Sequence, residues 1–366
     1  MEAAITGYLS LLEGFITASD GAGGESKLRY AVNFKWTNSM LGLSVVEQQD
    51  AIFDFCCILV NIGLWYTKHA AVVAGKDGIS MDEAKDVHKC LRKAAGVFQL
   101  VKDEKGKLLQ QEMVTAPGAD LDSRILDAYM HQSVAEAQEV TVARAIELKH
   151  AASLTSALAN ETSKIFQSAL VSLQTLEDPV FGKWKIYLQL KHAIYQAYAY
   201  TYMGENLLAQ DQGGSAVSAM KQALKWYESS ELLCKEYAAA KGPGLSAKPE
   251  SHLFFRRLGP LVRRILEKAE RENGFIYHQN VPEEPPELEL KATYGLAKPE
   301  EFSLSKISSE WTPAVYSAFD LSRGMKEDAK KSAGGGQTTE KLPEMQEKSS
   351  GHSGNDQNNT SGCILS

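Results

Sequence analysis

Helical periodicity runs through most of this chain and restricts its fold more than any other feature. From Val45 to Arg271, apolar residues return every three or four positions, the spacing that places them on one face of a helix. The clearest stretches are 51–74, 82–100, 123–148, 154–176, 184–209 and 215–237. The sequence therefore predicts a mainly α-helical fold.

Local signals mark where some of these helices begin and end. Ser80 followed by Glu83 has the form of a capping box, which predicts a helix start. The pair Gly213-Gly214 indicates a tight turn between two helices. Beyond Asn273 the chain is aromatic and interrupted by proline, which predicts an extended arm across the helices. We expect this arm to be buried through Phe275, Ile276, Tyr277, Leu288 and Leu290.

One segment favours a strand instead of a helix. Residues 28–36 partly alternate apolar and polar side chains and include aromatic residues suited to a pleated surface. A single strand is not stable alone, so its partner must come from elsewhere or be missing from this chain.

The helical hairpin at 191–237 has small alanines at positions where two helices would approach closely. This pattern is typical of tetratricopeptide-like repeats, although the full consensus is absent. From the residues alone, an ordinary helical hairpin is equally consistent with the pattern.

The last residues of the chain differ sharply from the rest. Residues 323–362 are nearly free of apolar side chains, which predicts a disordered tether after a folded body at 1–322. The final four residues, Cys-Ile-Leu-Ser at 363–366, match the prenylation box, in which a terminal serine favours farnesyl. We therefore predict that Cys363 carries a farnesyl group.

Several function classes are disfavoured by composition and motif content. The net charge of −7 disfavours a protein that binds nucleic-acid phosphates. The cysteines lack zinc-site or disulfide spacing, and no nucleophile elbow, P-loop, dinucleotide fingerprint or zinc-protease motif is present. We expect no enzyme activity, no metal, no cofactor and no small-molecule substrate. The apolar run 51–66 is interrupted by Asp54 and Asn61 and is shorter than a membrane span requires.

A possible binding surface lies around residues 135–158. Gln138 and Glu139 are flanked by apolar positions, which predicts half-buried side chains whose polar ends are satisfied locally. Leu154 and Leu158 lie one helical turn apart, as do Lys85 and Lys89. An apolar stripe edged by lysines suits an amphipathic helix with an acidic flank. Taken alone, the residues favour the simpler interpretation of core leucines and solvated lysines.

A set of short segments resembles the Bro domain family. These segments are Phe34-Lys-Trp, Ala135-Glu-Ala-Gln-Glu-Val, His252-Leu-Phe-Phe-Arg, Glu272-Asn-Gly-Phe-Ile-Tyr-His and the terminal box. The resemblance implies an elongated, boomerang-shaped helical domain with a tetratricopeptide-like core and a small residual β element near the N-terminus. It also implies that the chain begins inside the usual N-terminal region, so we expect an exposed, poorly paired edge at 28–36.

The resemblance further implies a partner and a site for it. Such domains bind the C-terminal amphipathic helix of ESCRT-III subunits of the charged multivesicular body protein 4 group. By position, Leu154 and Leu158 take the central aliphatic places, and Lys85, Lys89 and Arg144 form the basic edge. Thr141 replaces a phenylalanine of a related domain. The expected function is that of a prenylated adaptor on the cytoplasmic face of endosomes or the nuclear envelope. The alternative is a tetratricopeptide-like scaffold for a different peptide.

Overall fold

The chain forms two compact units. The computed structural model describes residues 2–21, 24–42, 44–76, 78–105, 116–243, 249, 253–288, 291–292, 294–303 and 306–319. The small unit contains residues 1–35 and 47–55 and the described part of 303–359, and the helical unit contains 36–46 and 56–302. The predicted tether at 323–362 and the prenylation box with Cys363 lie outside the described residues.

The small unit contains helices α1 (Glu2–Ile16) and α10 (Pro313–Ala318). The indole of Trp311 donates a hydrogen bond of 2.7 Å to the Leu11 carbonyl and meets Phe15 edge to face. The buried guanidinium of Arg29 is paired with Asp50 at 2.7 Å. Helix α1 was not predicted, because clear helical spacing in the sequence begins only at Val45.

The predicted strand is present but shorter, and it has a partner. Strand β1 (Phe34–Thr37) is hydrogen-bonded to β2 (Val45–Gln48) in a two-stranded sheet, while residues 27–32 form turns and bends. The partner comes from elsewhere in the chain, which is one of the two alternatives expected, but the predicted strand bounds of 28–36 are wrong. The prediction that helical structure begins at Val45 is also wrong, because α2 begins only after Asp50. The Asp50 carboxylate accepts a hydrogen bond from the backbone amide of Ile52.

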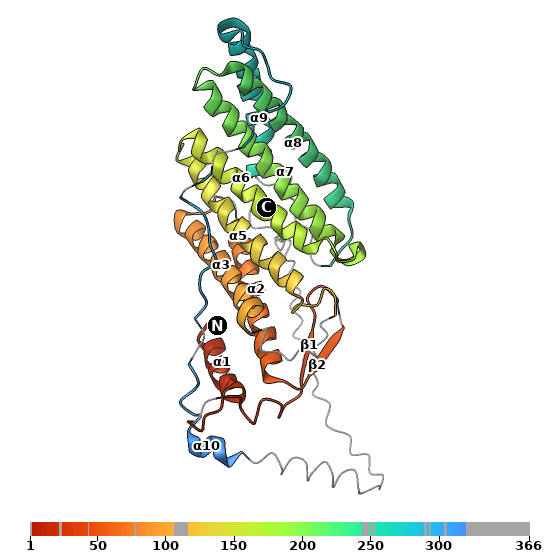
Figure 1. The fold of residues 1–366 in the computed structure, drawn as a ribbon, viewed down its shortest axis with the longest axis vertical. Helices are drawn as coiled ribbons and strands as arrows, with labels where there is room; N and C mark the ends of the chain where they lie inside the picture. The colour runs from red at the N-terminus through yellow and green to blue at the C-terminus, as the bar shows by residue number, and fades with distance from the viewer. Residues whose placement is uncertain are drawn as a thin grey trace. The chain divides into compact units, whose positions relative to one another are not determined.

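The helices predicted between residues 51 and 271 are confirmed. They are α2 (Ala51–Ala74), α3 (Met81–Leu100), α5 (Ser123–Glu147), α6 (Ala152–Leu173), α7 (Asp178–Leu208), α8 (Gly213–Ala239) and α9 (Leu253–Glu272). Two π-helical turns, η1 (Val101–Lys105) and η3 (Asn273–Tyr277), follow α3 and α9. From α3 to α9, each helix packs on the next one along the chain (Figure 1).

Helix α2 is longer than the apolar run that the sequence analysis considered. Its 24 residues are long and apolar enough to cross a membrane, but more than half of the apolar window is buried within the protein. Phe55, Leu59 and Val60 are at most 1% exposed. Burial of this kind is typical of the core helix of a folded domain.

Helix ends agree with the sequence signals at one place and differ at another. At the start of α3, Ser80 and Glu83 exchange both hydrogen bonds of a capping box. The two glycines at 213 and 214 do not form the turn before α8; they are the first residues of that helix. A Cβ atom at Gly214 would overlap the Asn280 carbonyl, so glycine is required for close packing and not for turning.

The most polar part of the core lies between α5 and α7. The Lys191 ammonium is 2.7 Å from a carboxylate oxygen of Glu139, and both side chains are almost fully buried. Burial raises the pKa of Glu139, and the Lys191 ammonium opposes this shift. Next to this pair, Glu136 accepts hydrogen bonds from Gln132 and Tyr187. Burial, followed by the charge of Glu139, raises the pKa of Glu136 to about 7.

We predict that Glu136 makes the stability of the fold fall as the pH rises from 4.5 to 7. In this window the folded state holds a proton that the unfolded state, with an ordinary pKa of 4.5, has released. The free energy of unfolding should therefore decrease by on the order of 3 kcal/mol relative to a Glu136→Gln variant. Urea titrations at several pH values measure this difference.

Glu228→Gln, which changes an exposed carboxylate on α8, provides the control. Its free energy of unfolding should stay parallel to that of the wild type. Parallel curves for Glu136→Gln would show that Glu136 is not protonated in the fold at neutral pH.

Candidate functional site

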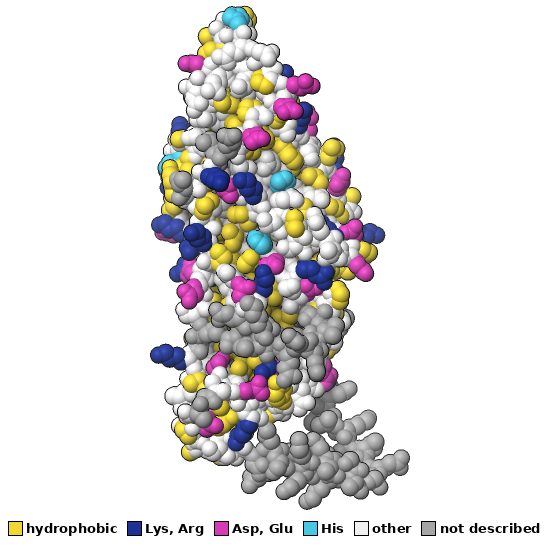
Figure 2. Space-filling model, in the orientation of Figure 1, with side chains coloured by type: hydrophobic (Ala, Val, Ile, Leu, Met, Phe, Trp, Pro, Cys, Tyr) yellow, Lys and Arg dark blue, Asp and Glu magenta, His cyan; other side chains and the backbone are white. Residues whose placement is uncertain are grey.

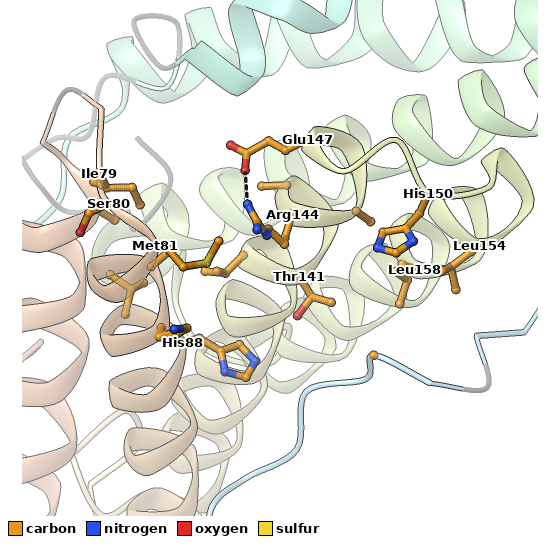
Figure 3. Close-up of a pocket in the computed structure, with 18 of the residues that line it drawn as sticks. Ile79, Ser80, Met81, His88, Thr141, Arg144, Glu147, His150, Leu154 and Leu158 are labelled. Carbon is orange, nitrogen blue, oxygen red and sulfur yellow. Dashed lines mark hydrogen bonds and ion pairs between the residues drawn. The ribbon is translucent and has the colours of Figure 1, made fainter.

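An apolar groove of about 590 Å³ lies on the helical unit, between α3, α5 and α6 (Figure 3). One side is formed by the end of α2 and by α3, the other by α5 and α6, and the arm after residue 291 contributes Tyr294 and Gly295. The lining includes Ala74, Ile79, Met81, Ala84, Val87, Val140, Ala143 and Ala145. Because most of the residues that line the groove are apolar, the groove suits an apolar ligand surface.

The two leucines of α6 both line this groove. Leu154 is half-buried, whereas Leu158 is only 2% exposed and also belongs to the hydrophobic core. In Figure 3 they lie one turn apart on α6, next to His150. Leu158 is therefore both a core residue and a groove residue, so each of the two interpretations from the sequence is partly correct for it. Leu154 is the more accessible leucine.

Thr141 and Arg144 reach the groove from α5. Arg144 forms an ion pair of 3.3 Å with Glu147 on the same helix. The backbone of Gly295 passes directly over this region, since a Cβ atom there would lie 3.5 Å from the Thr141 methyl and 3.4 Å from Leu158. Gly295 has a φ of +77°, so the conformation also favours glycine.

The two lysines of α3 differ in position. Lys85 lines the groove, and Lys89, although exposed, is not among the lining residues. Met81, Lys85 and His88 follow the i, i+4, i+7 spacing that keeps side chains on one helix face, and Lys89 is one position beyond it. Sequence reasoning therefore missed His88, which this spacing from Met81 could have indicated.

Charges at the groove are of both signs. Lys85 is 3.0 Å from Asp82, and both side chains are highly exposed, so their attraction contributes little to stability. Burial, followed by the charge of Arg92, lowers the pKa of His88. On the face shown in Figure 2, basic and acidic side chains are likewise interspersed among hydrophobic ones. The rim of the groove is therefore less basic than the sequence comparison implied.

The arm is held against α5 by Gln138, which is fully buried. The Gln138 amide donates a hydrogen bond of 2.8 Å to the Gly295 carbonyl and accepts one of 2.5 Å from the Ala297 amide. These partners are distant in sequence, so the expectation of local satisfaction for Gln138 is wrong. Farther along, the Arg92 guanidinium donates to the Lys298 carbonyl at 2.9 Å.

The earlier part of the arm is less buried than the sequence predicted. Phe275 is 80% exposed and Ile276 is 66% exposed, since both belong to the π-helical turn η3 that follows α9. Leu288 does pack against the core, whereas Leu290 lies outside the described residues.

One group of side chains in the described part of the chain has a composition suited to a metal ion. The donor atoms of His69, Asp86 and Cys90 lie within 4.8 Å of one another. His69 is already paired with Asp86 at 3.0 Å, and the Cys90 thiol donates to Asp86 at 3.7 Å. These contacts account for the group as an ordinary surface ion pair, so we assign it no metal.

Comparison with known proteins identifies the family. The BRO1-like domain model matches residues 20–319. The BRO1 domain-containing protein BROX of Homo sapiens is 50% identical over 90% of this chain and 80% of its own length, and that of Danio rerio is 50% identical over 88% and 78%. The chain belongs to the BROX family of BRO1 domain proteins. A BROX homolog of Caenorhabditis elegans is 44% identical over 98% of this chain and 85% of its own length.

Solved structures agree with the BROX assignment at the level of the fold. The ALIX BRO1 domain in complex with CHMP4C has a TM-score of 0.63 at 18% identity, covering 84% of this chain and 81% of that one. A Bro1 domain described as a basis for endosomal targeting has a TM-score of 0.62 at 23% identity, with coverage of 88% and 82%. The helical BRO1 fold is thus confirmed, and membership of this adaptor family makes the BROX-type chain an adaptor and not an enzyme.

We predict that Gln138→Leu releases the arm from α5. The substitution leaves the Gly295 carbonyl and the Ala297 amide without their partner, which should cost roughly 2–3 kcal/mol for the two lost hydrogen bonds. Hydrogen exchange followed by mass spectrometry should show faster exchange at 294–298. Gln222→Leu on α8 is the control and should leave exchange at 294–298 unchanged. Unchanged protection of 294–298 in the Gln138 variant would show that Gln138 does not hold the arm on α5.

Proposed function

We propose that the groove between α3, α5 and α6 binds the C-terminal amphipathic helix of an ESCRT-III subunit of the CHMP4 group. The observation that carries the proposal is an apolar groove with an accessible leucine, Leu154, on a BRO1 fold. The ALIX BRO1 domain, which has the same fold, has been solved in complex with CHMP4C, and this supports the same class of partner here.

An amphipathic helix fits the groove for physical reasons. Its apolar face would cover Leu154 and the exposed part of Met81, and each fully buried aliphatic side chain contributes about 1.5–3 kcal/mol. Its acidic flank would approach Lys85 and Arg144, whose present partners Asp82 and Glu147 belong to exposed and readily exchanged ion pairs. Thr141 offers a small apolar contact, while Lys89 contributes only at longer range.

The same proposal includes a lipid at Cys363. A single farnesyl chain gives marginal and reversible membrane binding, so a second contact is required for stable residence. Subunits that have polymerised on a membrane present many copies of the tail helix, and a flexible tether at 323–362 would convert a weak groove contact into an avid one. We propose that the chain acts at the cytoplasmic face of endosomes or of the nuclear envelope, and a related Bro1 domain described for endosomal targeting supports the former.

We predict that Leu154→Asp removes binding of a CHMP4-type tail peptide. A carboxylate in the covered groove would lose its hydration without gaining a partner, so the affinity should fall by about 100-fold or more. Because Leu154 is half-buried and Leu158 is part of the core, only the former can be changed in this way without threatening the fold. Isothermal titration calorimetry measures the dissociation constant.

Leu224→Asp on α8 is the matched control, since Leu224 is also half-buried and packs on the core away from the groove. It reports the cost of a carboxylate at such a position and should leave the peptide affinity unchanged. Equal affinity of the wild type and Leu154→Asp for the tail peptide would show that the peptide does not bind in this groove. Competition with an unrelated extended peptide would then favour the scaffold alternative.

The lipid is tested separately by Cys363→Ser. The variant should bind the tail peptide with wild-type affinity, but its membrane-bound fraction in cells should fall, because the terminal thiol is the attachment atom. Cell fractionation with quantitative immunoblotting provides the measurement. The same membrane fraction for both proteins, together with an unmodified Cys363 in mass spectra of the wild type, would refute lipidation and leave the groove assignment standing.

A further inference from the structure

Helix α9 carries four exposed arginines that are not among the residues lining the groove. Its segment Leu-Phe-Phe-Arg-Arg-Leu-Gly-Pro-Leu-Val-Arg-Arg at 253–264 contains four arginines and no acidic residue. The buried side chains of α9 are Leu258, Val262, Ile265 and Ala269, whose spacing defines the inner face. The four arginines, Arg256, Arg257, Arg263 and Arg264, lie outside this inner stripe and are all exposed.

Tyrosines of the underlying helices lie close to these arginines. The Arg263 guanidinium lies 5.3 Å from the ring centre of Tyr227 on α8. The positive charge of Arg257 acts on Tyr198 and that of Arg264 on Tyr202, both on α7, where it partly opposes the burial that raises the pKa of each tyrosine. Arginines seven positions apart on one helix lie about 10 Å from each other. The guanidinium groups therefore form two pairs on α9, one on each side of Pro260.

The absence of acidic partners sets these arginines apart. Outside α9, every arginine in the described part of the chain is in an ion pair: Arg29 with Asp50, Arg92 with Glu300, Arg124 with Asp122 and Arg144 with Glu147. Among the described residues, none of the four arginines at 256–264 has such a partner. In a chain with a net charge of −7, residues 253–264 are therefore a local run of positive charge, and the next acidic residue of α9 is Glu267, one turn after Arg263.

We propose that the arginine face of α9 docks on an anionic phospholipid surface. Guanidinium groups bind phosphate through two parallel hydrogen bonds and keep their charge across the physiological pH range. A bilayer offers phosphates everywhere along its plane, so two exposed arginine pairs on one helix need no shaped partner. Each basic residue near an anionic membrane strengthens binding by about fivefold.

The choice of a membrane over an acidic protein rests on the proposed farnesyl at Cys363, which would bring the chain to a lipid surface. The arginine face would then supply a second attachment that does not require the partner helix. Helix α9 packs on α8, α7 and η3, not on the helices that form the groove, so a membrane contact through α9 leaves the groove available (Figure 1).

The test uses full-length Cys363→Ser protein, which cannot be prenylated, so the result does not depend on the lipid. Its binding to phosphatidylcholine vesicles with and without phosphatidylserine is measured by co-sedimentation. We expect binding to the anionic vesicles only, weakening as salt is added. Replacing Arg256, Arg257, Arg263 and Arg264 together by glutamine should reduce the partition constant on the order of several hundred-fold.

The matched control replaces four exposed lysines outside the groove, Lys27, Lys35, Lys68 and Lys164, by glutamine and changes the net charge equally. It should retain most of the vesicle binding. Circular dichroism verifies that both variants fold, and tail-peptide affinity of the arginine variant reports the groove independently. Equal losses in the two variants, or no binding of the starting protein to anionic vesicles, would overturn the proposal. Binding to soluble polyglutamate but not to vesicles would overturn it in favour of an acidic protein partner.

Discussion

The buried ion pair between Glu139 and Lys191 fixes α5 against α7 in the interior of the helical unit. It joins α5 to α7 across a nearly water-free interface at 2.7 Å. Removing either partner would leave an uncompensated charge in the core, which typically costs 3–5 kcal/mol. Gln138, the preceding residue, projects from α5 in a different direction and holds the arm through Gly295 and Ala297. Two adjacent polar residues therefore fix α5 against both the next helices and the arm.

This anchoring of α5 determines the groove. Thr141 and Arg144 follow Gln138 on the same helix, so their positions relative to α6 depend on how α5 is held. The arm backbone at Gly295 rests on Thr141 and Leu158 and closes one side of the groove. A groove formed in this way exists before a ligand arrives, and a preformed site loses less conformational entropy on binding than one that must be assembled.

Sequence periodicity predicted the long helices because their apolar residues recur at helical spacing. Helix α9 buries one stripe, through Leu258 and Val262, whereas α5 is buried on all sides between Ser133 and Glu139. It failed where long-range contacts decide the structure. The strand at Val45–Gln48 exists because β1 pairs with it, and the partners of Gln138 lie more than 150 residues away. Lys89 was placed in the site by comparison with a relative, whereas the groove face of α3 runs through Met81, Lys85 and His88. The groove thus required the packing of three helices, which a single sequence does not specify.

The net charge of a whole chain does not show how charge is distributed over its surface. A value of −7 argues against binding to phosphate, but it is a sum over the whole chain. Screening at physiological salt confines electrostatic interactions to about 8 Å, so a surface responds to the charges within that distance and not to the total. Arginines that are paired, such as Arg29 and Arg124, present little free positive charge to a ligand. In the described part of the chain, Arg256, Arg257, Arg263 and Arg264 form no ion pair, so the field next to them is positive although the chain as a whole is acidic.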